Sequence, residues 1–467
     1  MSAHAAPATP ATRARIPART WTALMVVGLA GQLAWTVENL YLNVFVYNTI
    51  TTDPTVIAIL VAASAVAATL ATFLMGAASD RLRKRRPFIA LGYLLWGATT
   101  AAFGLVQPGS GAVAAQAVGA AVLAIVLLDC LMSFLGATAN DAAFNAWVTD
   151  STVPENRGRV DGVLAVMPLM AMLLVFGALD GLTQAAQWRA FFGIVGGLTA
   201  AVGVLAWFTI RDSDRIEANP DGYLAAVLHG LRPSSVRANP RLYVVLAAWA
   251  VVGVSTQVFL PYLIIYIQHY LRIDDYALIL AVVLLGASVA SVVGGRVIDR
   301  VGKRRAIVPA VGIMVAGMVG MFVARSPLAL MAAGTVMMSG FMVSFAALGA
   351  SVRDETPRDR VGTVQGLRMV AVVLVPMVLG PFIGAWVIKG ADETFVDLGV
   401  TKQVPTPWVF VAAAVVAVLV LVPMAFLRRL PAIPGMVPDG TARGAESTDH
   451  EPATAVAGHE HDEVEPA

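Results

Sequence analysis

Two acidic residues stand inside long apolar stretches of the chain and are its first candidates for chemistry. Glu38 lies within residues 21–47, and Asp129 lies within residues 113–138. A charge in the middle of a bilayer is unfavourable unless it faces a cavity or a partner, so such residues are functional candidates. Because burial disfavours the charged form of a carboxyl group, either side chain could carry a proton. A structural hydrogen bond to a neighbouring helix is the alternative for both.

The stretch around Glu38 also carries amides and an aromatic ring at helical spacing. At 100° per residue, Gln32, Asn39 and Asn43 fall on one stripe. Trp35 and Glu38 fall on a neighbouring stripe. A hydrogen-bonding face beside an aromatic ring suits the hydroxyl groups and ring of a sugar. The alternative is that these amides hydrogen-bond neighbouring helices.

Two further stripes carry hydrogen-bonding groups at helical spacing. Ser133 and Asn140 share the helix face of Asp129. Residues 242–267 supply three more candidates for lining a cavity, which are Gln257, Tyr262 and Tyr266. A kink is expected beside them at Pro261.

The sequence contains no arrangement of residues typical of an enzyme. It has no Walker-type phosphate loop, no zinc-ligand spacing and no Ser/His/Asp set. The single cysteine, Cys130, lies inside an apolar run and is interpreted as a packing residue. We therefore expect neither an enzyme activity nor a cofactor or metal site, and no direct use of ATP.

Composition places these candidates in a membrane protein. Of the 467 residues, 58% are hydrophobic and 13% are charged, against about 25% charged in soluble domains. The mean hydropathy is +0.75. The net charge of +2 is too small to suggest a nucleic-acid partner.

Twelve apolar stretches must position the candidate residues. Each is close to or longer than the roughly 20 residues that cross a bilayer as a helix. Lipid offers no partner to exposed backbone amides, which favours helices. The stretches fall at 21–47, 55–78, 87–107, 113–138, 162–180, 190–210, 242–267, 276–295, 305–324, 327–350, 369–389 and 407–427. The chain is thus predicted to be an all-α polytopic membrane protein.

The distribution of Lys and Arg predicts the orientation of these helices. With the N-terminus placed inside, 27 of the 32 basic residues lie on the inner side. The five outer ones are Arg189, Arg272, Arg325, Lys389 and Lys402. Because basic residues concentrate in cytoplasmic loops, both termini are expected in the cytoplasm.

A basic loop occurs twice and indicates a duplicated chain. The segment GAASDRLRKRR at 76–86 is followed 219 residues later by GRVIDRVGKRR at 295–305. A second pair of similar loops begins at Asp150 and Asp354. Duplicated halves with a site between them are a common design of solute carriers. We therefore expect two pseudo-symmetric six-helix bundles.

The basic loops are candidates for controlling conformation. An aspartate at a helix end could accept hydrogen bonds from the other bundle or pair with its own arginines. The alternative is that the basic residues only set topology and bind anionic lipid headgroups. The motif residues are Gly76, Asp80, Arg81, Arg85, Arg86, Gly295, Asp299, Arg300, Arg304 and Arg305.

The same features predict five consecutive regions. A cytoplasmic segment at 1–19 precedes an N-terminal bundle at 20–210, and a cytoplasmic linker at 211–240 precedes a C-terminal bundle at 241–430. The region 431–467 is acidic and rich in Pro, Gly and Ala, so we expect a disordered cytoplasmic tail.

Twelve helices, a central linker and a repeated basic loop resemble the major facilitator superfamily. The loop at 76–86 resembles the superfamily's signature between helices 2 and 3, and the loop at 295–305 resembles its counterpart between helices 8 and 9. The resemblance covers about residues 20–430. Within the superfamily, SDR at 79–81 with RRPFI at 85–89 looks like the sucrose-type and glycoside–pentoside–hexuronide sugar carriers.

Three departures from these relatives bear on function. The second helix has no acidic residue, which argues against sodium coupling. Where sucrose-type carriers commonly have an arginine on helix 4, the nearest equivalent is Asn145. Drug/proton antiporters carry a Gly-Pro-x-x-Gly-Gly stretch in helix 5, of which the fifth predicted helix here has only Pro168. A related sequence, GPFIG, occurs at 380–384 in the eleventh.

The resemblance implies a secondary active transporter in the cytoplasmic membrane, acting as a monomer in contact with membrane lipids. Its two bundles would rock around a midplane cavity. The expected partners are protons and a small-molecule substrate, a mono- or disaccharide moved by symport. One alternative is a proton-coupled exporter of drugs or other hydrophobic compounds. The other is a membrane receptor or polytopic enzyme without transport.

Overall fold

A computed structural model describes residues 16–106, 114–152, 154–212, 230, 232–356, 361–391, 393–397 and 400–430. Within these ranges, twelve helical spans are long and apolar enough to cross a membrane. The predicted number and order of helices is therefore confirmed. The expected disordered tail, most of the N-terminal segment and much of the central linker lie outside the described residues.

The first six spans are built from the following elements, in chain order. They are α1 (Ala18–Thr36), η1 (Val37–Tyr41), α2 (Leu42–Thr49), α3 (Pro54–Leu82), α4 (Arg86–Ala102), η2 (Phe103–Leu105), α5 (Ala114–Gly136), η3 (Ala137–Phe144), α6 (Asn145–Asp150), α7 (Pro154–Leu174), η4 (Val175–Leu179), α8 (Asp180–Gln184) and α9 (Trp188–Thr209).

The short helix α11 (Pro233–Ala238) precedes the second six spans. These are α12 (Pro240–Phe259), η5 (Leu260–Tyr262), α13 (Leu263–Ile265), η6 (Tyr266–Tyr270), α14 (Tyr276–Val301), α15 (Lys303–Val323), α16 (Pro327–Glu355), α17 (Val361–Met369), η8 (Val370–Leu374), α18 (Val375–Ala391), α19 (Trp408–Val418) and α20 (Leu421–Arg429). The expected interruption at Pro261 is a 3₁₀ turn, η5.

Helix pairing repeats between the two halves of the chain. In the first half α3 packs on α5, α1 packs on both α7 and α9, and α4 packs on α9. In the second half the equivalent spans pair in the same way: α14 on α16, α12 on α18 and α19, and α15 on α19. Between the halves, α3 packs on α18, and α14 packs on α7. The same pattern in both halves is what a duplicated pair of six-helix bundles requires.

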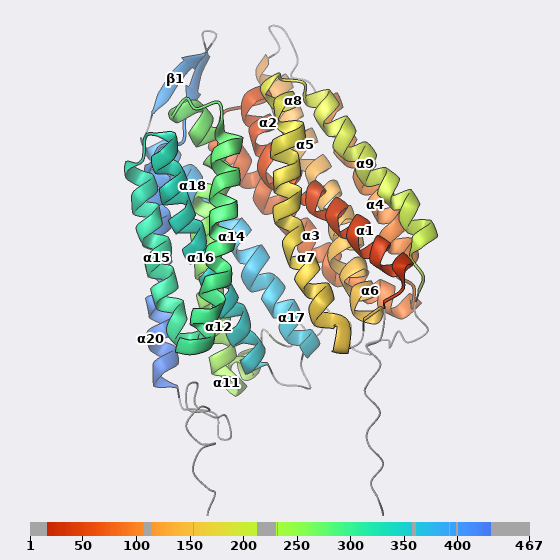
Figure 1. Cartoon of the computed structure of the whole chain (residues 1–467). Coiled ribbons are helices and arrows are strands. Elements are labelled where there is room, and N and C mark those ends of the chain that lie inside the picture. The colour runs from red at the N-terminus through yellow and green to blue at the C-terminus, as the bar shows by residue number, and fades with distance from the viewer. Residues whose placement is uncertain are drawn as a thin grey trace, which may run out of the picture.

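The molecule has two distinct ends (Figure 1). One end carries a two-stranded antiparallel hairpin, β1 (Thr394–Asp397) and β2 (Val400–Gln403), in which Thr394 pairs with Gln403. We call this the hairpin end. The opposite end carries α11 and the end of α20, together with the first basic loop, and we call it the basic end. The hairpin was not predicted, because its residues lie in a short loop between apolar stretches.

Five of the twelve spans contain a turn of π-helix, namely η1, η3, η4, η6 and η8. Such turns add a residue to the helical repeat and are frequent at functional sites. The turn η3 also lies where the predicted fourth stretch, 113–138, gives way to residues broken by polar side chains; the span runs on to Asp150. Polar residues after 138 suggested the end of the membrane span, but several of them face the interior of the protein.

Close packing of α4 on α9 depends on glycine. A methyl group added at Gly196 would lie 2.6 Å from the backbone nitrogen of Ala101 and even closer to the carbonyl oxygen of Gly97. The adjacent Gly197 has no atom of another element within 4 Å of the same position. Small residues at such crossings let two helix backbones approach each other in a membrane.

We expect Gly196→Val to destabilise the first bundle, because backbone cannot move away as a flexible side chain can. Overpacking of this kind costs about 1–3 kcal/mol or more. Thermal unfolding of the purified protein in detergent, followed by size-exclusion chromatography, measures the effect. Gly197→Val is the matched control and should unfold at the wild-type temperature; equal losses in both variants would contradict the assigned crossing.

Candidate functional site

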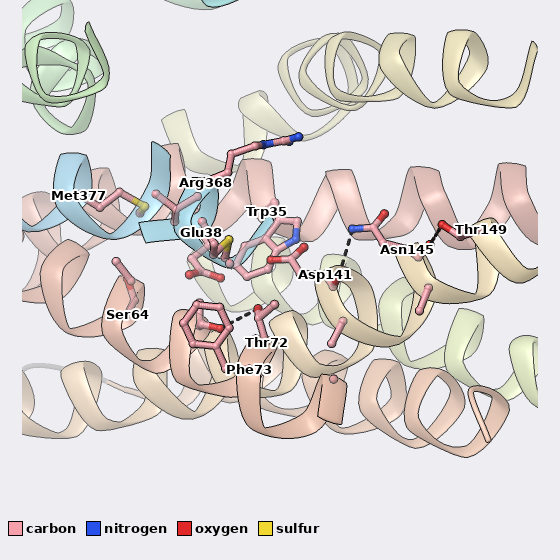
Figure 2. Close-up of a pocket in the computed structure, with 18 of the residues that line it drawn as sticks. Trp35, Glu38, Ser64, Thr72, Phe73, Asp141, Asn145, Thr149, Arg368 and Met377 are labelled. Carbon is pink, nitrogen blue, oxygen red and sulfur yellow. Dashed lines mark hydrogen bonds between the residues drawn. The ribbon is translucent and has the colours of Figure 1, made fainter. Parts of the chain in front are cut away.

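A cavity of about 910 Å³ lies between the two halves of the chain. Its wall in the first half comes mainly from η1, α3, η3 and α6, and its wall in the second half comes from α17, η8 and α18. The lining side chains include polar, aromatic and apolar groups, several of which Figure 2 labels. Among the lining residues are Trp35, Glu38, Asn39, Ser64, Phe73, Asp141, Asn145, Arg368, Met369 and Met377.

The cavity extends from the middle of the bundle to the basic end. Its lining begins at Glu38 and Ser64, which lie within membrane spans, and continues to Gly76, Asp80 and Thr149 near the ends of their helices. A solute could therefore reach the mid-membrane residues from the basic end.

Contacts between the two halves close the opposite, hairpin end. The Tyr262 hydroxyl donates to the carbonyl oxygen of Pro54 in the first half at 3.0 Å, and also contacts that of Pro381 in its own half at 2.9 Å. Three further contacts join the halves: Tyr47 Oη with the Gln403 carbonyl at 2.5 Å, Asn48 Oδ1 with His269 Nε2 at 2.9 Å, and Asp53 with Lys389 at 2.9 Å. Access is thus open at one end and sealed at the other.

The ion pair at this seal lies outside the apolar part of the helices. Partial burial alone would raise the pKa of Asp53. Hydrogen bonds from Lys389 and from Thr55 outweigh that effect, so the pKa of Asp53 lies below its ordinary value. The carboxylate form that pairs with Lys389 is therefore favoured down to acidic pH, and the contribution of this pair is lost as the pH falls through that lowered pKa.

Asp180 joins the two halves at a more deeply buried point of the seal. Its side chain is 3% exposed and accepts hydrogen bonds from the hydroxyl groups of Tyr41, at 2.8 Å, and Tyr276. Gln184 Nε2 donates to its other oxygen at 2.7 Å. Since Tyr276 belongs to the second half and the other three residues to the first, opening this end requires the Tyr276 bond to break.

The two acids singled out in the sequence lie close together in the first half. Glu38 is on the π-turn η1, lines the cavity and is 6% exposed. The Ser133 hydroxyl donates to Glu38 Oε1 at 2.6 Å. Asp129 is 1% exposed, on the same helix as Ser133, with Ser64 beside it. Among the described residues, Glu38 Oε2 and Asp129 Oδ1 have no hydrogen-bond partner.

A third acid, Asp141, lies on the cavity wall beside Trp35 (Figure 2). Asn140 Nδ2 donates to Asp141 Oδ1 at 2.9 Å, and Trp35 also hydrogen-bonds this carboxyl group. Asn140 is held in turn by the Tyr93 hydroxyl at 2.9 Å. These contacts fix the orientation of the Trp35 ring at the cavity surface.

The structure separates the predicted cavity residues into three groups. Trp35, Glu38 and Asn39 line the cavity, as do the motif residues Gly76, Asp80 and Arg85. Asp129, Ser133 and Asn140 lie behind the wall and contact residues that line it. The remaining candidates do not line this cavity: Gln32, Asn43, Gln257, Tyr262 and Tyr266.

The residues of the third group have other contacts. Asn43 is buried and donates to the Asn39 carbonyl at 2.9 Å, and Gln257 packs against Gly380. Tyr262 belongs to the seal described above. Tyr266 stacks on Tyr270 with ring centroids 5.4 Å apart.

Several lining residues did not stand out in the sequence. Asp141 did not stand out, because it lies beyond residue 138, where the predicted fourth apolar stretch ends. Arg368 was counted only as a topological charge, although it lies inside the eleventh span, Gly366–Ala391. Ser64 and Met377 look like ordinary residues of apolar helices. Only the position of Arg368, at the edge of an apolar stretch, was a usable signal.

The first basic loop is organised around Arg85. Its guanidinium group contacts Asp80 at 2.5 Å and Asp150 at 3.1 Å, and donates to Ser79 Oγ at 2.6 Å. Asp212 Oδ1 accepts from the backbone nitrogens of Arg85 and Arg86, at 2.6 and 2.8 Å, at the start of α4. All these partners belong to the first half, so the described contacts of Asp80 stay within its own bundle.

The second basic loop has a similar centre in the other half. Glu355 accepts from Arg304 and, at 3.3 Å, from Arg241, while Lys303 pairs with Asp354 at 2.7 Å. The side chain of Asp299 lies outside the described residues. The other motif residues are placed as follows: Arg86 over the Trp207 ring at 4.5 Å, Arg81, Arg300 and Arg305 exposed, and Gly295 partly buried on α14.

We expect Arg85→Met to destabilise the protein strongly, because it leaves two carboxylates without their shared cation. Removing one partner of a buried ion pair costs roughly 3–5 kcal/mol. The melting temperature of the purified variant measures the loss. Lys84→Met is the control, since Lys84 is an exposed cation of the same loop; a similar drop for Lys84→Met would show that loop charge alone matters.

Comparisons with known proteins agree with this architecture. The family model of the Major Facilitator Superfamily matches residues 21–285 and 245–456. No curated protein sequence matches this one significantly. The solved structures described next are all less than 25% identical to it, so their likeness concerns the fold alone.

Three of those structures illustrate the likeness. A mutant form of the nucleoside transporter NupG has a TM-score of 0.69 at 13% identity, covering 87% of this chain and 99% of that one. A bacterial homologue of the human lysosomal transporter Spinster, inward-facing and occupied, has a TM-score of 0.65 at 16% identity, covering 88% and 96%. The xylose transporter XylE from E. coli, in a partially occluded inward-open form, has a TM-score of 0.63 at 14% identity, covering 90% and 100%.

The family match spans both halves, and its matched ranges contain the two basic loops and the residues of the cavity wall. In the structure, equivalent helices pair in the same way within each of those two halves. The chain therefore belongs to the Major Facilitator Superfamily and is a multi-pass membrane transporter.

Proposed function

We propose that this transporter moves a small polyhydroxylated solute, a mono- or disaccharide, in symport with protons. The observation that carries the proposal is the composition of the cavity wall. Buried carboxyl groups lie beside amides and the half-buried ring of Trp35, in a space reached from one end of the molecule only. The protein would act as a monomer in the cytoplasmic membrane.

The charge distribution supports an orientation for this cavity. Most Lys and Arg residues belong to the basic end, which the positive-inside rule assigns to the cytoplasm. The cavity would then open inward, and the seal at the hairpin end would face outward. Alternating access requires the opposite arrangement as well. In that second state the Tyr276–Asp180 and Tyr262–Pro54 bonds would be broken.

The basic loops fit such an exchange of states. In this structure the described ion pairs of both loops lie within single halves. When the basic end closes, Asp80 could exchange Arg85 for groups of the other half. A ligand shifts such an equilibrium only through its different affinities for the two states.

Glu38 and Asp129 are our candidates for carrying the proton. Both are nearly inaccessible, and each has one oxygen without a hydrogen-bond partner among the described residues. Glu38 also lines the cavity, so protonation there could respond directly to a bound solute. The Ser133 bond to Glu38 links the two acids through one helix.

Trp35, Asn39 and Asn145 are the groups best suited to a sugar. An aromatic face packs against the apolar face of a sugar ring, and amides both donate to and accept from hydroxyl groups. All three side chains line the cavity, from two different spans of the first half. Asn145 would occupy the place where sucrose-type carriers commonly have an arginine.

A proton-coupled exporter of hydrophobic compounds is a second candidate, favoured by the opposite wall. Phe73, Met369 and Met377 line the cavity and offer an apolar, adaptable surface. Such a surface alone does not explain the buried acids and amides facing it. Direct transport assays separate the two functions.

In proteoliposomes with an imposed inward proton gradient, we expect accumulation of a radiolabelled sugar from a panel of mono- and disaccharides. Collapse of the gradient by a protonophore should abolish accumulation, while empty liposomes serve as the control. Expulsion of a hydrophobic dye, with no sugar accumulated, would support the exporter instead.

Proton coupling predicts a specific defect in Glu38→Gln and Asp129→Asn. A neutral amide cannot release a proton, so gradient-driven accumulation should fall at least about tenfold, whereas sugar exchange between equal concentrations should continue. Thr99→Val, at a half-buried position of α4 that does not line the cavity, is a folding and reconstitution control. Normal accumulation by both acid variants would remove these residues from the coupling mechanism.

A further inference from the structure

Arg368 is the feature of the cavity that the proposed function leaves unexplained. It lies on α17, within the eleventh span, and lines the cavity together with residues of the first half. Figure 2 shows its side chain extending from the α17 ribbon on the side of Trp35 and Asp141 away from Phe73. Its guanidinium carbon lies 5.6 Å from the centre of the Trp249 ring. An exposed cation thus faces a mid-membrane space.

No carboxylate of the described residues lies within 4 Å of Arg368. The other arginines deep at the bundle ends differ in this respect: Arg85 contacts Asp80 and Asp150, and Arg304 contacts Glu355. A cation over an aromatic ring gains some stabilisation but keeps its need for hydrogen-bond acceptors. Arginine presents five donors and no acceptor.

Three of the four acids of the cavity wall already have partners of their own, and the fourth, Asp161, is exposed on α7. Ser133 holds Glu38, while Asn140 and Trp35 hold Asp141. Asp80 is paired with Arg85. The wall therefore contains acids with hydrogen-bond donors on the first half and, among the described residues, an arginine without an anion on the second half. A negatively charged solute would complete this arrangement.

Resting on the proposed function, we propose that the polyhydroxylated solute carries one carboxylate, as an acidic sugar does. Its carboxylate accepts two parallel hydrogen bonds from Arg368, the geometry that guanidinium groups favour. Its hydroxyl groups lie against Asn39 and Asn145. Contact with both halves at once gives such a solute a higher affinity for a closed state than for the open one.

The charge of the site favours a carboxylate over a phosphate ester. One guanidinium group balances one negative charge, whereas a phosphate monoester carries nearly two at neutral pH. The second arginine on the cavity wall, Arg85, is already engaged by two carboxylates. A phosphate would also bring its extra charge towards the acids of the first half.

Binding of three related polyols to the purified full-length protein tests this assignment. Gluconate and sorbitol differ only in a carboxylate replacing a hydroxymethyl group, and sorbitol 6-phosphate supplies the phosphate. By isothermal titration calorimetry, we expect gluconate to bind at least about 30-fold more tightly than sorbitol, as a charge-assisted pair implies. Sorbitol 6-phosphate should bind more weakly than gluconate.

Variants of Arg368 connect that preference to one residue. Arg368→Gln should reduce the preference for gluconate over sorbitol to less than about threefold, because the paired donors for the carboxylate are lost. Arg368→Lys keeps the charge but not the paired donors and should give an intermediate preference. Arg353→Gln is the control, because it removes a nearby exposed cation that does not line the cavity. Melting temperature verifies that each variant is folded.

Each outcome decides between the proposals. If sorbitol binds as tightly as gluconate, or if Arg368→Gln retains the preference, the carboxylate assignment is wrong, while sugar transport can still stand. Tightest binding of sorbitol 6-phosphate would replace the carboxylate by a phosphate. If no polyol binds and no sugar is accumulated, both the solute class and the proposed function are wrong.

Discussion

The unfavourable transfer of polar groups into hydrocarbon determines most of what this molecule looks like. Backbone amides are satisfied within helices, and twelve helices result. The same constraint acts on side chains: an acid or an arginine inside a span must have a partner or face a water-accessible space. Glu38, Asp129, Asp141 and Arg368 all meet this condition at or beside one cavity. The position of the cavity therefore follows from the positions of these charges.

The π-turns let polar side chains within a span face the cavity while the backbone of the helix stays hydrogen-bonded. Glu38 and Asn39 lie on η1, and Asp141 lies on η3. An extra residue in the turn rotates the following side chains relative to a regular α-helix. The stripe that a regular helix predicts for Asn39 and Asn43 is consequently divided, with Asn39 at the cavity and Asn43 buried beside it.

Two kinds of contact hold the halves in this arrangement. Contacts between halves concentrate at the hairpin end, where Tyr262 and Tyr276 of the second half bind groups of the first. Ion pairs at the basic end remain within one half, around Arg85 and around Glu355. Each half is thus stiffened internally, while the side-chain contacts that must change between states are a few hydrogen bonds and the Asp53–Lys389 ion pair. Rigid halves with a small exchangeable interface suit a rocking movement.

The sequence by itself determined the membrane class, the number of helices and their duplication, because apolar length and the spacing of the GAASDRLRKRR loop are local properties. It also identified Glu38 and Trp35, since an acid within an apolar run stands out without a structure. Only the tertiary structure shows that Arg368 lies across the cavity from them and that Asp180 contacts Tyr276. It also shows that Tyr262, predicted to line the cavity, belongs to the closed hairpin end. Those outcomes depend on helix rotation and on packing between halves, which no periodicity within one segment encodes.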